Sequence, residues 1–135
     1  MNTIRLSLFT LGLALAGCSF AARSPDMYRD DTRAVLDTKN EQIKGCYDEL
    51  LKTNKDAQGK VTVKFTVAKD TGAFTNVTAD PAGTTAPPEL TNCVTTALTG
   101  LVLSPGDKSE GQATFEYEFT AGAPAAAEPV PPPAG

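Results

Sequence analysis

The chain has 135 residues, with 12 basic and 16 acidic side chains and a formal net charge of -4, and it lacks histidine and tryptophan. Hydrophobic residues make up 41% and charged residues 21%, which is typical of a folded domain. The acidic balance argues against a nucleic-acid partner. Without histidine the commonest general base and metal ligand are missing, so we expect a non-enzymatic protein with no cofactor and no small-molecule substrate.

The first 17 residues are typical of a secretory signal peptide. Arg5 precedes an apolar run over residues 6–15, which is too short to span a bilayer as a helix and ends in small residues. The sequence LAGC at 15–18 resembles the bacterial lipobox, in which cleavage exposes the cysteine as the first residue. The resemblance implies removal of residues 1–17 and lipidation of Cys18. An ordinary signal peptide followed by a chance cysteine is the alternative.

A lipid on Cys18 would make the protein a lipoprotein of the bacterial envelope. Each buried methylene contributes about 0.8 kcal/mol, so several acyl chains anchor a protein durably. Ser19, where an aspartate would favour the inner membrane, favours an outer-membrane anchor with the domain in the periplasm or at the cell surface. We expect residues 18–25 to form the lipidated cysteine and a short tether.

The folded domain is expected to occupy residues 26–120 and to begin with a helix. Ser24-Pro25-Asp26 is typical of a helix start, with acidic residues near its positive end. Apolar residues then recur at helical spacing: Val35, Leu36, Ile43, Cys46, Tyr47, Leu50 and Leu51. We expect a helix that is broken near Asn40 and ends around Thr53.

A β-hairpin is predicted over residues 59–79. Val61, Val63, Phe65 and Val67 alternate with polar residues, which indicates a strand with one apolar face. The residues DTG at 70–72 are typical of a turn. The apolar pattern resumes beyond the turn with a shift in parity, so we expect a bulge in the second strand.

A second helix and a closing strand complete the predicted domain. Pro87 and Pro88 suit a helix start, because proline at the first turn wastes no hydrogen bond. One apolar stripe follows: Leu90, Cys93, Val94, Ala97, Leu98 and Leu101. Alternating aromatic residues predict the last strand: Ala113, Phe115, Tyr117 and Phe119.

The order helix, strand, strand, helix, strand predicts an α+β fold. We expect a small antiparallel three-stranded sheet with two helices on one face. The Ala/Pro-rich tail, residues 121–135, has no apolar face to bury and is expected to be disordered.

Cys46 and Cys93 lie on the apolar stripes of the two predicted helices. Because both helices must cover the same sheet face, the two sulfur atoms can meet, and an oxidising envelope compartment would preserve a disulfide between them. Two free buried thiols are the alternative. No Cys-x-x-Cys spacing points to redox catalysis.

Four segments together resemble the AgmX/PglI-type C-terminal domain, which is similar to the TonB C-terminal domain. They are Cys46-Tyr47-Asp48, GKVTVKF at 59–65, Gly72-Ala73-Phe74 and Cys93-Val94. The resemblance covers residues 43–119. It implies an αββαβ fold, an envelope protein as partner, and binding of an extended partner segment by strand addition. Gliding-motility complexes are the family's envelope association.

By this resemblance the closing strand is the exposed sheet edge, with Gln112, Thr114, Glu116 and Glu118 as the strand-addition residues. The two glutamates would serve equally well to protect the edge against pairing. We therefore expect a lipid-anchored protein-interaction or structural module. A structural lipoprotein whose tail contacts the cell wall or a motility or transport complex is the alternative.

The sequence also contains one superficial enzyme motif. DTGA at 70–73 matches the active-site loop of dimeric aspartic proteases, in which two aspartates share a proton. The same residues form a sensible hairpin turn, and Lys69 directly precedes them. An aspartic-type hydrolase is therefore the remote alternative.

Overall fold

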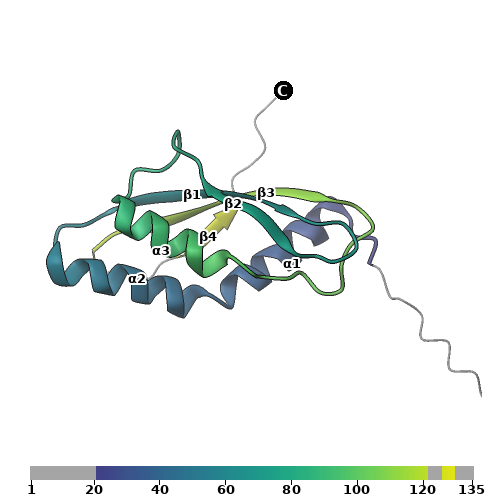
Figure 1. Ribbon diagram of the computed structural model, residues 1–135, viewed down its shortest axis with the longest axis horizontal. Helices are drawn as coiled ribbons and strands as arrows, with labels where there is room; N and C mark the ends of the chain where they lie inside the picture. The colour runs from purple at the N-terminus through teal and green to yellow at the C-terminus, as the bar shows by residue number, and fades with distance from the viewer. Residues whose placement is uncertain (1–20, 122–125, 130–135) are drawn as a thin grey trace, which may run out of the picture.

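A computed structural model describes residues 21–121 and the backbone of residues 126–129. The elements in chain order are α1 (Pro25–Asp37), α2 (Asn40–Thr53), β1 (Gly59–Val67), β2 (Phe74–Ala79), α3 (Pro88–Leu98), β3 (Gly111–Phe119) and β4 (Ala126–Pro129). The helices cover one face of an antiparallel sheet with strand order β2-β1-β3-β4 (Figure 1). The predicted α+β class is confirmed. The predicted signal peptide (1–17) and Cys18 lie outside the described residues.

The first predicted helix is two helices that meet close to the expected break. Ser24 caps α1, its hydroxyl accepting a hydrogen bond from the N–H of Met27 at 3.3 Å. At the junction the N–H of Lys39 donates to the carbonyl of Leu36, three residues back, so the chain tightens and changes direction. Leu36 before the junction and Ile43 after it are both fully buried. The junction therefore lets both helices turn an apolar side toward the sheet.

The predicted alternation of β1 is confirmed on its apolar face and is modified on its polar face. All four apolar residues of β1 are buried, together with Phe115, Tyr117 and Phe119 of β3. Thr62, on the opposite face, is also buried, because the loop after β2 folds over it. The Thr62 hydroxyl donates to the carbonyl of Gly83 at 3.0 Å. The expected bulge occurs where the register of β1 against β2 shifts between Lys64 and Thr66.

The sheet has a fourth strand that was not expected. Residues 126–129 of the Ala/Pro-rich tail form β4, which pairs with β3 from Phe115 to Glu118. The prediction that the whole tail is disordered is wrong for this segment; its other residues, apart from Ala121, lie outside the described part of the chain. Apolar alternation could not reveal β4, because main-chain hydrogen bonds to a neighbouring strand need no particular side chain.

Replacing either of two buried core tyrosines by phenylalanine should change the free energy of unfolding in opposite directions. The Tyr47 hydroxyl donates to the carbonyl of Ala57 at 2.6 Å, whereas the Tyr117 hydroxyl is buried with no hydrogen-bond partner among the described residues. Burial, and then the charge of Asp37, raises the pKa of Tyr117. We expect Tyr47→Phe to lower the free energy of unfolding by about 1 kcal/mol and Tyr117→Phe to raise it by about 1 kcal/mol. Urea unfolding of both variants measures this, and equal losses would contradict the difference.

Candidate functional site

The open part of the sheet edge follows from the direction of the β1 main chain. The carbonyl groups of Lys60 and Thr62 accept hydrogen bonds, each of 2.8 Å, from N–H groups at Thr85 and Asp80 in the loop after β2. The even-numbered residues of β1 therefore point their main-chain groups away from β3. In an antiparallel ladder these directions alternate along the strand. The odd-numbered residues of β1 then bond to β3.

The pairing register of β1 with β3 fixes which residues of β3 direct their main-chain groups toward β1. The odd-numbered residues of β1 lie opposite odd-numbered residues of β3, for example Val63 opposite Phe115. The even-numbered residues of β3 consequently direct their N–H and C=O groups away from β1, toward the other edge. These are the four residues that the sequence predicted for strand addition: Gln112, Thr114, Glu116 and Glu118.

β4 divides this set of four residues in two. Glu116 pairs with Glu128 and Glu118 with Ala126, so the prediction of an open edge is wrong at these two positions. Gln112 and Thr114 have no strand partner on that side among residues 21–121 and 126–129. We call Gln112–Thr114 the open segment. Because it belongs to a strand that pairs with β1 along its whole length and with β4 from Phe115 to Glu118, its backbone is held extended.

A groove of about 1010 Å³ lies along the open segment. Tyr28 and Thr32 of α1 line it on one side, and Lys64 and Asp80 line it where it reaches the outer face of the sheet. Lys64 and Asp80 form an ion pair at 2.6 Å. The groove therefore offers an extended main chain at its floor and a mixture of polar and aromatic side chains at its walls.

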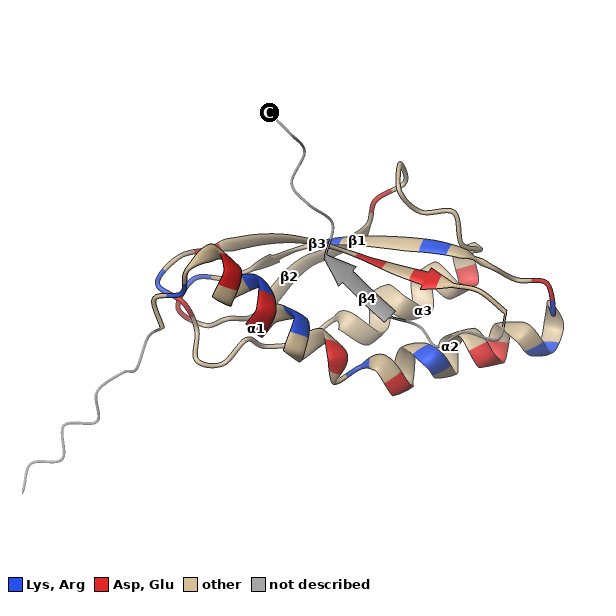
Figure 2. Cartoon of the chain, turned by 180° about the vertical axis from the view of Figure 1, so that it is seen from behind, with Lys and Arg blue, Asp and Glu red and all other residues tan. Residues whose placement is uncertain are grey.

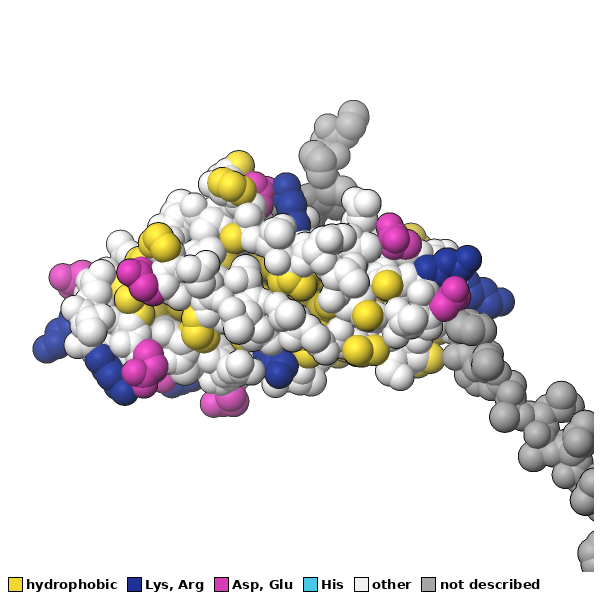
Figure 3. Space-filling view, viewed as in Figure 1, with side chains coloured by type: hydrophobic (Ala, Val, Ile, Leu, Met, Phe, Trp, Pro, Cys, Tyr) yellow, Lys and Arg dark blue, Asp and Glu magenta, His cyan; other side chains and the backbone are white. Residues whose placement is uncertain are grey.

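On the faces drawn in Figures 2 and 3 the described part of the domain shows no single-sign charged patch and no continuous hydrophobic patch. Basic and acidic residues are interspersed along α1 and α2, where several of them pair with one another (Figure 2). On the face shown in Figure 3, exposed hydrophobic atoms are scattered among polar ones. Among the described residues, the main-chain edge is thus the more distinctive feature.

The first described residues are bound to the domain rather than forming a free tether. The N–H of Ala21 donates to the carbonyl of Gly106, and the carbonyl of Ala21 accepts from the N–H of Lys108, both at 3.0 Å. Two residues on, the N–H of Arg23 donates to the Asp107 carboxylate at 2.9 Å. We call residues 21–23 the strap. The prediction that residues 18–25 are all tether is wrong from Ala21 onward.

Asp107 holds the strap through a buried carboxylate. Its side chain is 3% exposed, accepts from the N–H groups of Arg23 and Ser109, and lies 3.5 Å from the Arg23 guanidinium. Burial alone would raise the pKa of Asp107, but the hydrogen bonds from these two N–H groups and the Arg23 charge outweigh it and leave the pKa lowered.

We expect the strap to loosen in acid. Because the pKa of Asp107 is lower in the folded state than its ordinary value of 3.8, its stabilisation is complete above that value and is lost as the pH falls further. Asp107→Asn should therefore lower the free energy of unfolding at neutral pH and flatten its loss as the pH falls through and below 3.8. Urea unfolding over that fall in pH measures this, with Asp56→Asn in the exposed α2–β1 turn as control. If Asp107→Asn left the pH dependence of the free energy of unfolding unchanged, the stabilising role of the Asp107 carboxylate would be contradicted.

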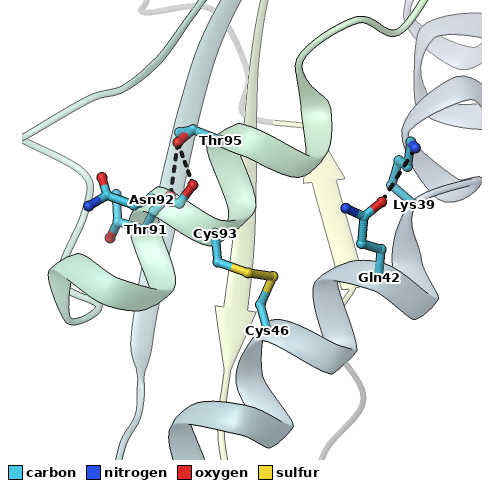
Figure 4. The surroundings of a disulfide bond; sticks show 7 residues. All are labelled: Lys39, Gln42, Cys46, Thr91, Asn92, Cys93 and Thr95. Carbon is cyan, nitrogen blue, oxygen red and sulfur yellow. Dashed lines mark hydrogen bonds between the residues drawn. A yellow bond between two sulfur atoms is a disulfide. The ribbon is translucent and has the colours of Figure 1, made fainter.

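A disulfide joins Cys46 of α2 to Cys93 of α3, with 5.9 Å between their Cα atoms (Figure 4). The alternative of two free thiols is therefore wrong. Cys46 is buried, whereas Cys93 is exposed, so the bond lies near the solvent side of the helix pair rather than within the apolar stripe of the second helix. The bond ties α3, which packs on β2 and β1, to α2, whose Tyr47 packs against Phe119 of β3.

The DTGA motif serves the β1–β2 turn. Asp70 has a positive φ of 64°, and its N–H donates to the carbonyl of Asp107 at 2.7 Å. Gly72 has a φ of 69°, and a Cβ atom there would lie 1.8 Å from the carbonyl oxygen of Leu103. A side chain at position 72 is thus excluded by the neighbouring loop, which explains this glycine structurally.

Comparison with known protein families, curated proteins and solved structures finds no match for the chain. The resemblance to the AgmX/PglI-type domain therefore stays a prediction. Among the described residues, none of the helices has the length and apolar character needed to cross a membrane, and no group of cysteine and carboxylate side chains is placed to hold a metal ion.

Proposed function

We propose that this protein is a lipid-anchored, non-enzymatic component of the bacterial envelope. Its domain binds an extended segment of a partner protein by strand addition to β3. The lipobox-like sequence at 15–18 supports the anchor, and the likeness to AgmX/PglI-type and TonB-like domains agrees with the binding mode. The observation that carries the proposal is the open segment, an extended stretch of β3 whose main-chain groups face a groove.

A peptide paired with the open segment would satisfy main-chain groups that have no strand partner among residues 21–121 and 126–129. Gln112 and Thr114 each offer one donor and one acceptor, which suits an extended chain of almost any sequence. Specificity would come from side chains of the groove, such as Tyr28 and the Lys64–Asp80 pair.

The chain's own tail is poorly suited to close this edge. The sequence continues after β4 with Val130 and then Pro131-Pro132-Pro133. Proline has no N–H and cannot donate to a β ladder. If the register of β4 continued, these prolines would stand opposite residues 111–113, whereas Val130, which has an N–H, would stand opposite Thr114. The sequence therefore favours a partner over the tail at Gln112.

Proline substitution on β3 tests the proposal without breaking the sheet. Because the N–H of Gln112 points away from β1, Gln112→Pro removes a donor from the open edge and none from the β1 ladder. We expect the variant to keep its thermal midpoint and to bind its envelope partner about tenfold more weakly, the loss of roughly one hydrogen bond.

The matched control is Gln112→Ala, which changes the side chain but keeps the donor, and it should retain partner binding. Quantitative pull-down from envelope extract compares the two variants with the wild type. Equal recovery of the same partners by wild type and by Gln112→Pro would contradict strand addition at this edge.

A further inference from the structure

We propose that one end of the domain rests on the phospholipid surface, so that the protein stands on the membrane in a fixed orientation. This end, which we call the hairpin end, comprises the β1–β2 turn, the loop from Leu101 to Glu110 and the first turn of α1. The proposal rests on the lipidation of Cys18, and its partner is the headgroup region of the bilayer.

The strap supplies the geometric reason. The N–H and the carbonyl of Ala21 both make hydrogen bonds to the loop, at Gly106 and Lys108. The N–H of Arg23 donates to the Asp107 carboxylate. Both side chains of the Arg23–Asp107 pair are at least 96% buried, since their exposed fractions are 4% and 3%. The domain therefore holds residues 21–23 in place only a few residues after Cys18.

The distance from the lipid to the domain is correspondingly short. Cys18 and Ala21 are three residues apart, and a fully extended chain spans at most about 3.5 Å per residue, or about 10 Å in all. A domain held so closely cannot turn freely around its anchor. Ala21, and with it the loop residues Gly106 and Lys108 to which it is hydrogen-bonded, must then lie within about 10 Å of the acylated cysteine.

Exposed apolar side chains provide an independent reason. Met27 and Val102 are the large hydrophobic residues with high exposure in the described part of the chain, at 56% and 51%. Met27 lies in the first turn of α1, and Val102 bridges to Ala73 beside the β1–β2 turn. Both therefore belong to the hairpin end, where a lipid interface would cover them.

The molecule is elongated, so the two ends meet different surroundings. Figure 1 shows the start of α1, the β1–β2 turn and the start of β3 at one end, with the α2–β1 turn at the other. Gln112 and Thr114 directly follow the start of β3. The open segment would then lie near the membrane, and its partner would present an extended segment close to that same surface.

Lysine reactivity measures this orientation with native residues at both ends. Lys69 and Lys108 are exposed at the hairpin end, and Lys52 and Lys55 are exposed near the α2–β1 turn. The mature chain, residues 18–135, is coupled through Cys18 to a maleimide lipid in phosphatidylcholine vesicles, because Cys46 and Cys93 are bonded and do not react. Acetylation rates are then read by mass spectrometry.

We expect the rates at Lys69 and Lys108 to fall severalfold relative to uncoupled protein, while those at Lys52 and Lys55 stay unchanged. A flexible Gly/Ser insertion of about ten residues between Ser19 and Phe20 should restore the rates at Lys69 and Lys108. Equal changes in rate at the two ends on coupling would overturn the proposal; protection that persists with the insertion would support it, with Met27 and Val102 rather than the short tether holding the hairpin end to the lipid. The coupling is chemical, so the result does not depend on whether cells lipidate Cys18.

Discussion

Loss of the Cys46–Cys93 disulfide is expected to lower the free energy of unfolding by about 4 kcal/mol. The two cysteines are 47 residues apart, and the chain-entropy treatment of such a closed loop gives this value. A domain of this size has a small core, so the loss would be a large fraction of its total stability. The main cause is that the bond restricts the unfolded chain.

Urea unfolding measures the effect in a Cys18→Ser background, where no third thiol can form mixed disulfides. Oxidised protein is compared with reduced protein and with Cys46→Ala/Cys93→Ala. We expect the free energies of unfolding of the two forms without the bond to agree within about 1 kcal/mol. They differ only by the loss of one thiol group at buried Cys46 and one at exposed Cys93. A loss below about 1 kcal/mol in both would contradict the role given to the disulfide.

Cys18→Ser is expected to move the protein from the membrane to the soluble fraction of the envelope. In the proposed anchor the Cys18 thiol is the nucleophile that forms the thioether to the lipid, and serine lacks it. Several acyl chains would contribute about 0.8 kcal/mol per buried methylene, so their loss would remove nearly all membrane affinity. Fractionation of cells that express each form measures this, with mass spectrometry of the N-terminal peptide to identify the lipid.

Ser19→Ala is the matched control, because it changes the adjacent residue and keeps the thiol. It should remain with the membrane. A wild-type protein that is already soluble, with an unmodified Cys18, would support the ordinary signal peptide and contradict the anchor.

Much of the fold could be predicted because side-chain periodicity reports burial. Val61 to Val67 alternate with polar residues, and all four apolar members of the strand are buried. Leu36 and Ile43 could both be assigned to the core, and the break between their helices was expected near Asn40. Periodicity could not show that Thr62 is buried, because the loop at Gly83 covers it from the polar face.

The features that periodicity missed are held by main-chain hydrogen bonds. β4 pairs with β3 although its residues are alanine, glutamate and proline, and Ala21 bonds to the loop at Gly106 and Lys108 although nothing in its side chain marks it. The sequence around Asp107 could have predicted part of this, since an acidic side chain in a glycine-containing loop often accepts hydrogen bonds from main-chain N–H groups. Its partner Arg23 is distant in sequence, so the pairing required the structure.

The candidate site was predicted from the resemblance to a domain family, which named Gln112, Thr114, Glu116 and Glu118 as the exposed edge. In the structure all four direct their main-chain groups away from β1. Their availability depends on the tail: residues 126–129 pair with the two glutamates, and within the described part of the chain no strand pairs with Gln112 and Thr114 on that side. The two glutamates therefore belong to the paired part of the sheet.

Photo-crosslinking in living cells tests the open segment most directly. A benzoylphenylalanine residue is placed at Gln112 in one strain and at Lys55 in another; Lys55 is an exposed residue of the α2–β1 turn, at the other end of the domain. We expect a crosslink to an envelope protein from position 112 that is absent from position 55 and is lost when Thr114→Pro is added. Identical crosslinks from the two positions, or none from position 112, would contradict it.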